Sequence, residues 1–325
     1  MRRHFFLALS AAVLASPIVA SSAYADAAYP SRPIHIVLGF PAGSATDIIT
    51  RIYADEIGKN INGTVVVENQ PGAASNIASA AVARAAPDGH TLLMATTANA
   101  TSVNLYKNLR YDFQKDFEPI ALLASAPPVI SVNAGSPIRS VEDLIKLAKS
   151  KPGEVMFGSS GVGTAPHMSA ELLNMMAGIK MTHVPYKGTN DAITDLITGR
   201  LKVLFSPLPT VASLAKEGKI RILAVTTKQR SSLAPDLPTV AESGVPDFDA
   251  TLWFGLMTPK GTPSAILKKL TSAVGKAAAS DGLKQRLQAS GGEPMLMTGD
   301  GFAKFIESNI ETWAKVINFA GMEKR

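Results

Sequence analysis

The segment from Ile34 to Asp47 is the feature that most constrains the fold of this chain. It begins with a short apolar run rich in branched side chains, Ile34 to Phe40, which is typical of a buried strand. The run breaks at Pro41-Ala42-Gly43, and Ser44 or Thr46 can then cap a helix. A helix that starts after such a loop has free backbone N–H groups, and its dipole favours an anion there. The segment therefore predicts either an anion site or an ordinary strand-to-helix turn.

Short apolar runs alternate with helical patterns along most of the chain. The sequence predicts strands at 34–40, 64–68, 91–96, 118–125, 129–132, 154–158, 182–186, 203–205, 220–226 and 253–257. Helical patterns separate these runs, and three helices close the chain, ending near residues 279, 288 and 320. Strand–helix repetition with short loops favours an α/β fold with mostly parallel sheets that helices cover on both faces.

The length of the chain favours two domains, because about 300 residues exceed the usual size of a single core. The stretch Ala126-Pro127-Pro128 reads as a boundary, after which a second α/β series begins. The helix-rich C-terminal part is expected to return to the first sheet. We therefore predict a first domain formed by residues 26–126 and 251–325 and a second formed by residues 127–250.

The N-terminus has the pattern of a cleaved secretory signal. Met1-Arg2-Arg3 is a positive start, Phe5 to Val19 is mostly apolar, and Ala23-Tyr24-Ala25 fits a cleavage site that leaves Asp26 first. The apolar run is too short for a comfortable membrane span, and no later stretch resembles one. We therefore predict a signal peptide at residues 1–25 and an exported protein.

Composition excludes several classes of site. The chain has no cysteine, which excludes disulfides, cysteine-bound metals and a thiol nucleophile. The formal charge of +6 includes Arg2 and Arg3, so it falls to +4 without the signal. Because the basic residues are scattered, without a basic run or interleaved aromatics, we expect no nucleic-acid binding.

A second glycine-rich loop, Gly158 to Thr164, also follows a predicted strand and precedes a helix. In open α/β sheets, ligands bind beyond the carboxyl ends of the strands. Two such loops on facing domains would line a cleft that closes by a hinge motion. Neither loop contains Lys or Arg, so an anion there would be held by amides and hydroxyl groups.

A third candidate segment runs from His183 to Asp191. In it, Tyr186 is either a cleft hydroxyl or a core aromatic, and Lys187 is either a cleft cation or a surface charge. Ser206, at a predicted strand end, offers a hydroxyl or belongs to a plain turn. His167, at a helix start, could orient the second loop or touch a ligand.

Signals of catalysis are weak throughout. The loop Gly158 to Thr164 matches neither the G-x-S-x-G nucleophile elbow nor a phosphate-binding P-loop. The five histidines lack metal-ligand spacing. We therefore expect no catalytic residue, metal or cofactor.

Several motifs, taken in order, resemble the Bug family of periplasmic solute receptors, the TctC-like extracytoplasmic component of the tripartite tricarboxylate transporter system. The resemblance covers nearly the whole mature chain. It rests on Tyr29-Pro30-Ser31-Arg32-Pro33-Ile34, Phe40 to Asp47, Glu68 to Ala73, Pro87 to Leu93, Gly158 to Thr164 with His167, His183 to Gly188, Leu223 to Thr227, Pro238 to Gly244 and Trp253-Phe254-Gly255.

The resemblance implies a two-lobed Venus-flytrap fold, the periplasmic-binding-protein fold, with a ligand carboxylate between the lobes. It also implies small ligands such as amino acids, di- or tricarboxylic acids or aromatic acids, and a membrane permease that receives them. We expect a monomer. The candidate ligand-binding residues are Phe40, Pro41, Ala42, Gly43, Ser44, Thr46, Asp47, Thr97, Ser159, Ser160, Gly163, Thr164, His167, Tyr186 and Ser206.

Two departures from the family pattern bear on specificity. Ser44 stands where the family often has a second glycine, and Ala74-Ser75-Asn76 replaces a more glycine-rich continuation. Two other functions stay open at this point: a ligand sensor that docks on a signalling kinase, and a periplasmic hydrolase or isomerase on the same fold.

Overall fold

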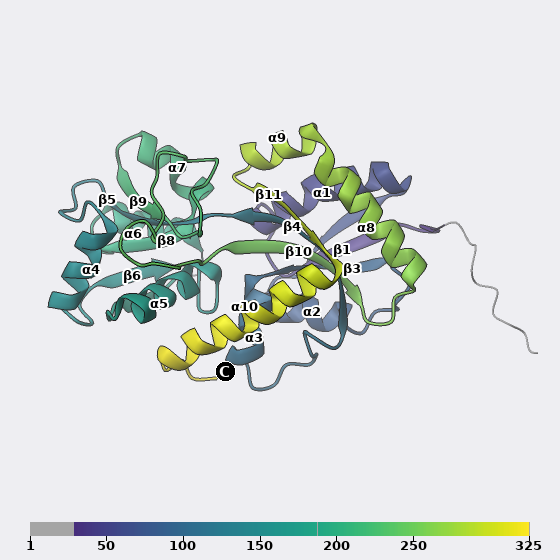
Figure 1. Cartoon of the computed structure of the whole chain (residues 1–325), viewed down its shortest axis with the longest axis horizontal. Coiled ribbons are helices and arrows are strands. Elements are labelled where there is room, and N and C mark those ends of the chain that lie inside the picture. Colours follow the sequence, from purple (N-terminus) through teal and green to yellow (C-terminus); the bar gives the residue numbers. More distant parts are fainter. Residues whose placement is uncertain (1–28, 187, 325) are drawn as a thin grey trace, which may run out of the picture.

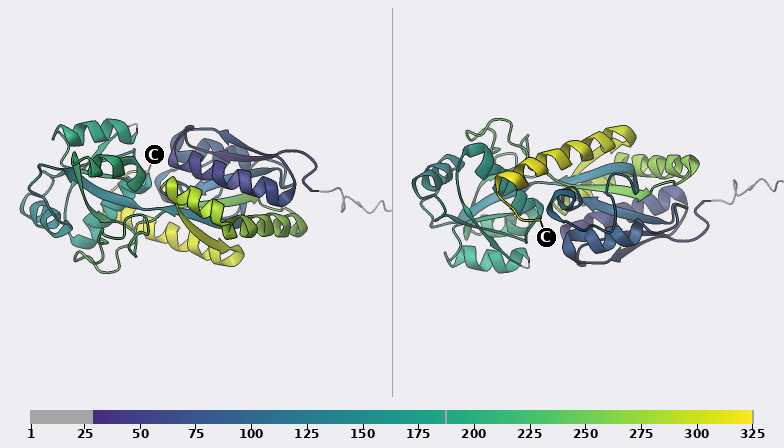
Figure 2. Two further views of the ribbon diagram at one scale, coloured as in Figure 1. Left: turned by 90° about the horizontal axis from the view of Figure 1, so that it is seen from above. Right: turned by 90° about the horizontal axis from the view of Figure 1, so that it is seen from below.

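The computed structural model describes residues 29–186 and 188–324, so the predicted signal peptide and Lys187 lie outside the described residues. The described chain forms two α/β lobes that lie side by side along the long axis (Figures 1 and 2). The first lobe contains β1 (Ile34–Leu38), α1 (Ala45–Ile61), β2 (Val65–Asn69), the 3₁₀ helix η1 (Ala73–Ser75), α2 (Asn76–Val82), β3 (Thr91–Thr96), α3 (Thr97–Leu105), β4 (Phe117–Ala126), β10 (Leu252–Pro259), α8 (Ser264–Ala279), α9 (Asp281–Ala289), β11 (Glu293–Thr298) and α10 (Gly299–Phe319). The second contains β5 (Pro128–Asn133), α4 (Val141–Ser150), β6 (Met156–Ser159), α5 (Ala165–Ala177), β7 (Thr182–Pro185), α6 (Thr189–Ile197), β8 (Val203–Pro207), α7 (Leu208–Lys216) and β9 (Ile220–Val225).

Side chains along β1 point alternately to the two faces of the first sheet, and helices cover both faces. Ile34, Ile36 and Leu38 are fully buried and pack with side chains of α1 and α8. Val37 points the other way, into a cluster with α2, α3 and α10. Burial of each such side chain contributes roughly 1.5–3 kcal/mol. The predicted α/β architecture with helices on both faces is confirmed.

The sheets are mixed, which corrects the expectation of mostly parallel strands. The first has the order β11-β4-β10-β3-β1-β2, and only the β3–β1 and β1–β2 pairs are parallel. The second has the order β7-β6-β8-β5-β9, and only β7–β6 and β6–β8 are parallel. The antiparallel pairs arise where the chain enters or leaves a lobe, because β4 and β10 run through the boundary in opposite directions.

The strand β11 is absent from the sequence prediction. Its residues, Glu293–Thr298, are only partly buried at the edge of the first sheet, next to β4. An edge strand of this kind lacks the continuous apolar run that identifies a buried strand.

The chain passes between the sheets twice, once at Ala126–Pro128 and once between Val225 and Leu252. The two crossings lie together, because Leu252 pairs with Ala126 and the Thr226 hydroxyl lies 3.1 Å from the carbonyl of Pro128. The helix α10 packs on α3 and β4 of the first lobe and also reaches α5 of the second (Figure 1). The exact domain limits stay a prediction.

Among the residues that the structure describes, no helix is long and apolar enough to cross a membrane.

Candidate functional site

A cavity of about 610 Å³ lies between the two lobes. The first lobe contributes Phe40, Pro41, Ala42, Gly43, Ser44, Ala45, Thr46, Thr96, Ala98 and Leu252, and the second contributes Ser160, Thr164, Ala165, Gly188, Thr189, Asn190, Asp191, Pro207 and Thr210. The volume suits a small organic molecule.

Five helices begin at this cavity. Each of α1, α3, α5, α6 and α7 directly follows a strand, respectively β1, β3, β6, β7 and β8. Within each lobe these strands are parallel, so their carboxyl ends meet at one edge of the sheet. The helix N-termini therefore converge on one space, where their dipoles favour negative charge.

The N-caps differ between the lobes. In the first lobe, the Ser44 hydroxyl accepts from the N–H of Asp47 at 3.3 Å, and the Thr96 hydroxyl accepts from the N–H of Ala98 at 3.2 Å. In the second lobe, the N-caps Thr164, Gly188 and Pro207 make no side-chain capping bond. The first-turn donors of α5, α6 and α7 are therefore not occupied by their own caps.

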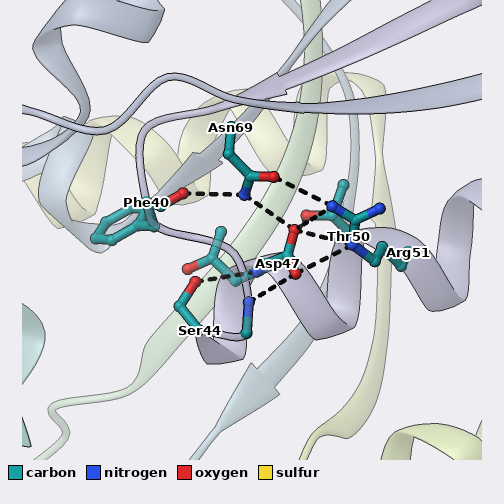
Figure 3. A network of polar contacts seen from close by, with 8 residues as sticks. Phe40, Ser44, Asp47, Thr50, Arg51 and Asn69 are labelled. Atoms are coloured by element: carbon teal, nitrogen blue, oxygen red, sulfur yellow. Dashed lines mark hydrogen bonds and ion pairs between the residues drawn. The ribbon is translucent and has the colours of Figure 1, made fainter.

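The first loop is held by the Asp47 carboxylate (Figure 3). It accepts from the backbone N–H of Gly43 at 2.9 Å and from the Asn69 amide at 2.9 Å, and it pairs with Arg51 at 2.9 Å. Burial raises the pKa of Asp47, but the hydrogen bonds from Arg51, Gly43 and Asn69 outweigh this effect and hold it below its ordinary value. The Asn69 amide also donates to the carbonyl of Phe40 at 3.0 Å.

The second loop is held in a comparable way. The N–H of Gly163 donates to Nδ1 of His167 at 3.1 Å, and the N–H of Gly161 donates to the Ser159 hydroxyl at 3.2 Å. The Ser159 oxygen lies 2.7 Å from Nε2 of His183. The amides of Gly43, Gly161 and Gly163 therefore donate within the loops and to the helices that follow them. That loop amides and hydroxyl groups hold an anion stays a prediction.

Eight of the fifteen predicted site residues line the cavity: Phe40, Pro41, Ala42, Gly43, Ser44, Thr46, Ser160 and Thr164. The other seven do not line it: Asp47, Thr97, Ser159, Gly163, His167, Tyr186 and Ser206. A direct binding role for any of the fifteen stays a prediction.

Most of the seven predicted residues that do not line the cavity form hydrogen bonds within the protein. The Thr97 hydroxyl accepts from the N–H of Trp253 at 3.2 Å, within the segment that returns to the first lobe. The Tyr186 hydroxyl donates to Asp195 at 2.9 Å, and burial together with this carboxylate raises the pKa of Tyr186 to about 12. Tyr186 therefore supports its own lobe. Ser206 is fully buried, and its hydroxyl has no partner among the described residues.

Eleven residues that line the cavity are not among the fifteen candidates, although Gly188 to Asp191 belong to the third candidate segment. They are Ala45, Thr96, Ala98, Ala165, Gly188, Thr189, Asn190, Asp191, Pro207 and Thr210, together with Leu252. The available signal was the rule that every helix following a parallel strand begins at the same edge. The sequence already indicated the ends of β7 and β8, through the segment His183 to Asp191 and through Ser206. Applied to β3 as well, the rule points to Thr96 and Ala98.

Asp191 is the one ionisable side chain among the described residues that line the cavity. It lies in the first turn of α6, is exposed, and forms no ion pair within the described chain. A carboxylate here makes the α6 side of the cavity less favourable for a second anion. Within residues 29–186 and 188–324, no cluster of three or more His, Asp or Glu side chains could hold a metal ion.

Comparison with known proteins gives a consistent result. The profile of the family described as "Tripartite tricarboxylate transporter family receptor" matches residues 49–322. The Rhodopseudomonas palustris protein Rpa4515, solved with adipate, is 35% identical with a TM-score of 0.81, covering 90% of this chain and 98% of that one. The periplasmic binding protein BugD is 31% identical with a TM-score of 0.79, covering 91% of this chain and 100% of that one. MatC from R. palustris, solved with malate, is 29% identical with a TM-score of 0.77, covering 89% and 100%.

Proposed function

Because the chain belongs to the tripartite tricarboxylate transporter receptor family, we propose that it is a periplasmic receptor that captures a small carboxylate between its lobes and delivers it to a membrane permease. The observation that carries the proposal is the convergence of five helix N-termini on one cavity of about 610 Å³. The two neighbours solved with adipate and malate support a carboxylate ligand.

Energies of ordinary size suffice for such binding. A hydrogen bond to a charged group contributes roughly 1.5–3 kcal/mol, so four of them near the upper end, about 12 kcal/mol, exceed the approximately 8 kcal/mol of micromolar binding. The surplus offsets the cost of ordering the ligand and closing the lobes. The donors that we assign to the carboxylate are the first-turn N–H groups of α5, α6 and α7 that remain, together with the Ser44, Ser160 and Thr164 hydroxyls. The N–H of Leu208 is excluded because it donates to the carbonyl of Pro127 at 3.0 Å, and Pro166 and Pro209 have no N–H.

The arrangement of Ser159 and His183 favours binding over hydrolysis. Their 2.7 Å contact has the spacing of a nucleophile and its base. However, Ser159 is fully buried and does not line the cavity. A ligand in the cavity would not reach this hydroxyl, so we propose that the acid is bound unchanged.

The test is calorimetry with adipate, L-malate, citrate, L-aspartate and nicotinate on the mature chain, with mass spectrometry of whatever co-purifies. We expect at least one acid to bind with a dissociation constant of about 1 μM or below, and NMR of the incubated mixture to show the acid intact. Failure of all five acids together with no co-purifying acid would contradict the proposal, and so would turnover of a bound acid.

Delivery to a permease needs its own experiment. Co-expression with the candidate permease subunits of the same genome, followed by uptake of the labelled acid, should show uptake only when the receptor is present. A receptor that binds the acid but leaves uptake unchanged would oppose the transport role.

A further inference from the structure

Two stacked histidines lie directly beneath the second loop, 159–164. The ring centroids of His167 and His183 are 3.9 Å apart with an angle of 25° between the planes. The His183 ring also stacks on Phe157, at 4.9 Å. His167 is 3% exposed. His167 is therefore buried in the second lobe, while His183 is partly exposed.

Each ring holds one end of the loop. Nδ1 of His167 accepts the N–H of Gly163 at 3.1 Å, and Nε2 of His183 lies 2.7 Å from the Ser159 oxygen. The residues between these anchors, including Ser160, reach the cavity proposed to hold the carboxylate. The position of the loop in the cavity wall thus depends on the two rings.

The bond from Gly163 fixes the state of His167. An N–H donor can approach Nδ1 only when that nitrogen carries no proton, so this ring is neutral, with its proton on Nε2. Nε2 lies 3.6 Å from the Glu171 carboxylate. Protonation at Nδ1 would place two N–H groups against each other and remove the anchor of the loop at Gly163.

Charged groups of two elements surround the rings. Glu171 of α5 faces His167, while Glu323 and Lys324, after α10, line a cavity of about 540 Å³ that both rings share. Two cationic rings at this separation would repel each other.

We propose that His167 is the positioning residue of the second loop and that only its neutral form holds the loop for ligand binding, so that acidification weakens capture. The inference rests on the proposed function, because the loop is assigned to the ligand cavity. Histidine ordinarily changes charge between about pH 5 and pH 8. The receptor would bind firmly at neutral or alkaline pH and loosely in acid.

Three variants separate positioning from general stability. In His167→Asn, the amide oxygen can replace Nδ1 as an acceptor and does not titrate. His167→Ala removes the acceptor altogether. His183→Gln keeps an acceptor near Ser159 and leaves His167 able to titrate.

The first measurement is calorimetry with adipate on the mature chain between about pH 5.5 and pH 8. We expect wild-type affinity to fall at least tenfold towards the acid end, and the His167→Asn affinity to fall by less than about threefold. His183→Gln should keep the fall, and His167→Ala should bind weakly at every pH. The same fall in His167→Asn as in the wild type would overturn the inference, as would wild-type affinity in His167→Ala.

The second measurement needs no ligand. In ¹⁵N NMR of the free protein, the Gly163 amide signal should move along one titration curve with the His167 ring signals, and in His167→Asn it should stay still. A Gly163 signal that does not respond to the ring would overturn the inference. If adipate fails to bind at any pH, adipate is removed from the proposed function, while this titration still decides the inference.

Discussion

The carboxylate of Asp47 accepts a hydrogen bond from the backbone N–H of Gly43 at 2.9 Å, closing the first loop onto the start of α1. The same carboxylate pairs with Arg51, one turn further along the helix. A buried acid therefore holds the loop that presents Ser44 to the cavity. The Gly43 amide therefore donates to the protein itself and not to a ligand. The negative charge next to the loop is that of the Asp47 carboxylate.

Asp47→Asn should destabilise the chain by about 1–3 kcal/mol at neutral pH, because it removes charged hydrogen bonds from a side chain that is 4% exposed. The pKa of Asp47 is lowered in the folded state. Its contribution is therefore complete above the unfolded pKa of about 3.9 and is lost as the pH falls through the folded value. Urea unfolding at several pH values should show the two proteins approaching equal stability below about pH 4.

Asp55→Asn is the matched control for this change. Asp55 also forms ion pairs, with Lys59 and Arg286, but its side chain is 48% exposed. Surface pairs contribute about 0–1 kcal/mol, so this variant should lose less than 1 kcal/mol. Equal losses in the two variants would remove the special role assigned to Asp47.

Glycine is required at position 163 because the backbone there has a positive φ and because the two lobes are in close contact at this point. Its φ is +79°, and a Cβ built there would lie 2.8 Å from Cδ2 of Leu105, in α3 of the first lobe. Gly163→Ala should therefore cost about 1–3 kcal/mol in urea unfolding and should weaken ligand binding. Gly178→Ala, with φ +60° and open space around the site, should cost only about 1 kcal/mol. If Gly163→Ala and Gly178→Ala lower the free energy of unfolding by the same amount, the contact with Leu105 contributes nothing to the cost.

The local parts of this fold follow from the sequence, and the long-range parts do not. The strand Ile34–Leu38, the turn at Gly43 and the start of α1 depend on neighbouring residues, so apolar alternation and glycine placement identify them. The direction of β10 depends on its insertion between β3 and β4, which are far away in sequence. No pattern within Leu252–Pro259 carries that information.

The candidate site divides in the same way. Its position at the strand ends was predictable, because helix starts follow parallel strands. The long-range side-chain contacts that hold the two loops were not, since Asn69 lies 22 residues from Asp47 and His183 lies 24 residues from Ser159. Those contacts exist only once the sheets have formed, and they fix the Asp47 and Ser159 side chains that accept from the amides of Gly43 and Gly161.

Asp191→Asn should change selectivity more than stability. If a second ligand carboxylate lies near α6, the charge of Asp191 opposes it by about 1 kcal/mol. The variant should then bind adipate roughly five- to tenfold more tightly, while hexanoate, with the same chain length and a single carboxylate, should change by less than about twofold. Calorimetry at low and high salt would measure both ratios, since salt screens this repulsion.

Glu217→Gln controls for the loss of any acidic charge from the second lobe. Glu217 follows α7, pairs with Lys219 and does not line the cavity. It should leave the adipate-to-hexanoate ratio unchanged. An equal gain for adipate and hexanoate in Asp191→Asn would show that this carboxylate does not select between the two acids.

Replacing Ala74 by glycine, the residue type that the family pattern favours in this loop, should stabilise the protein. Ala73, Ala74 and Ser75 all have positive φ, and Ala74 has φ 52° and ψ 48°. A left-handed conformation costs an L-residue about 1–2 kcal/mol, so Ala74→Gly should raise the free energy of unfolding by about 0.5–1 kcal/mol after the added chain entropy of glycine. Ala83→Gly makes the same chemical change at φ −56° at the end of α2 and should lower stability by about 0.5–1 kcal/mol. Urea unfolding should therefore give opposite signs for the two variants, and a loss at both positions would mean that the turn after Gly72 holds Ala74 without strain.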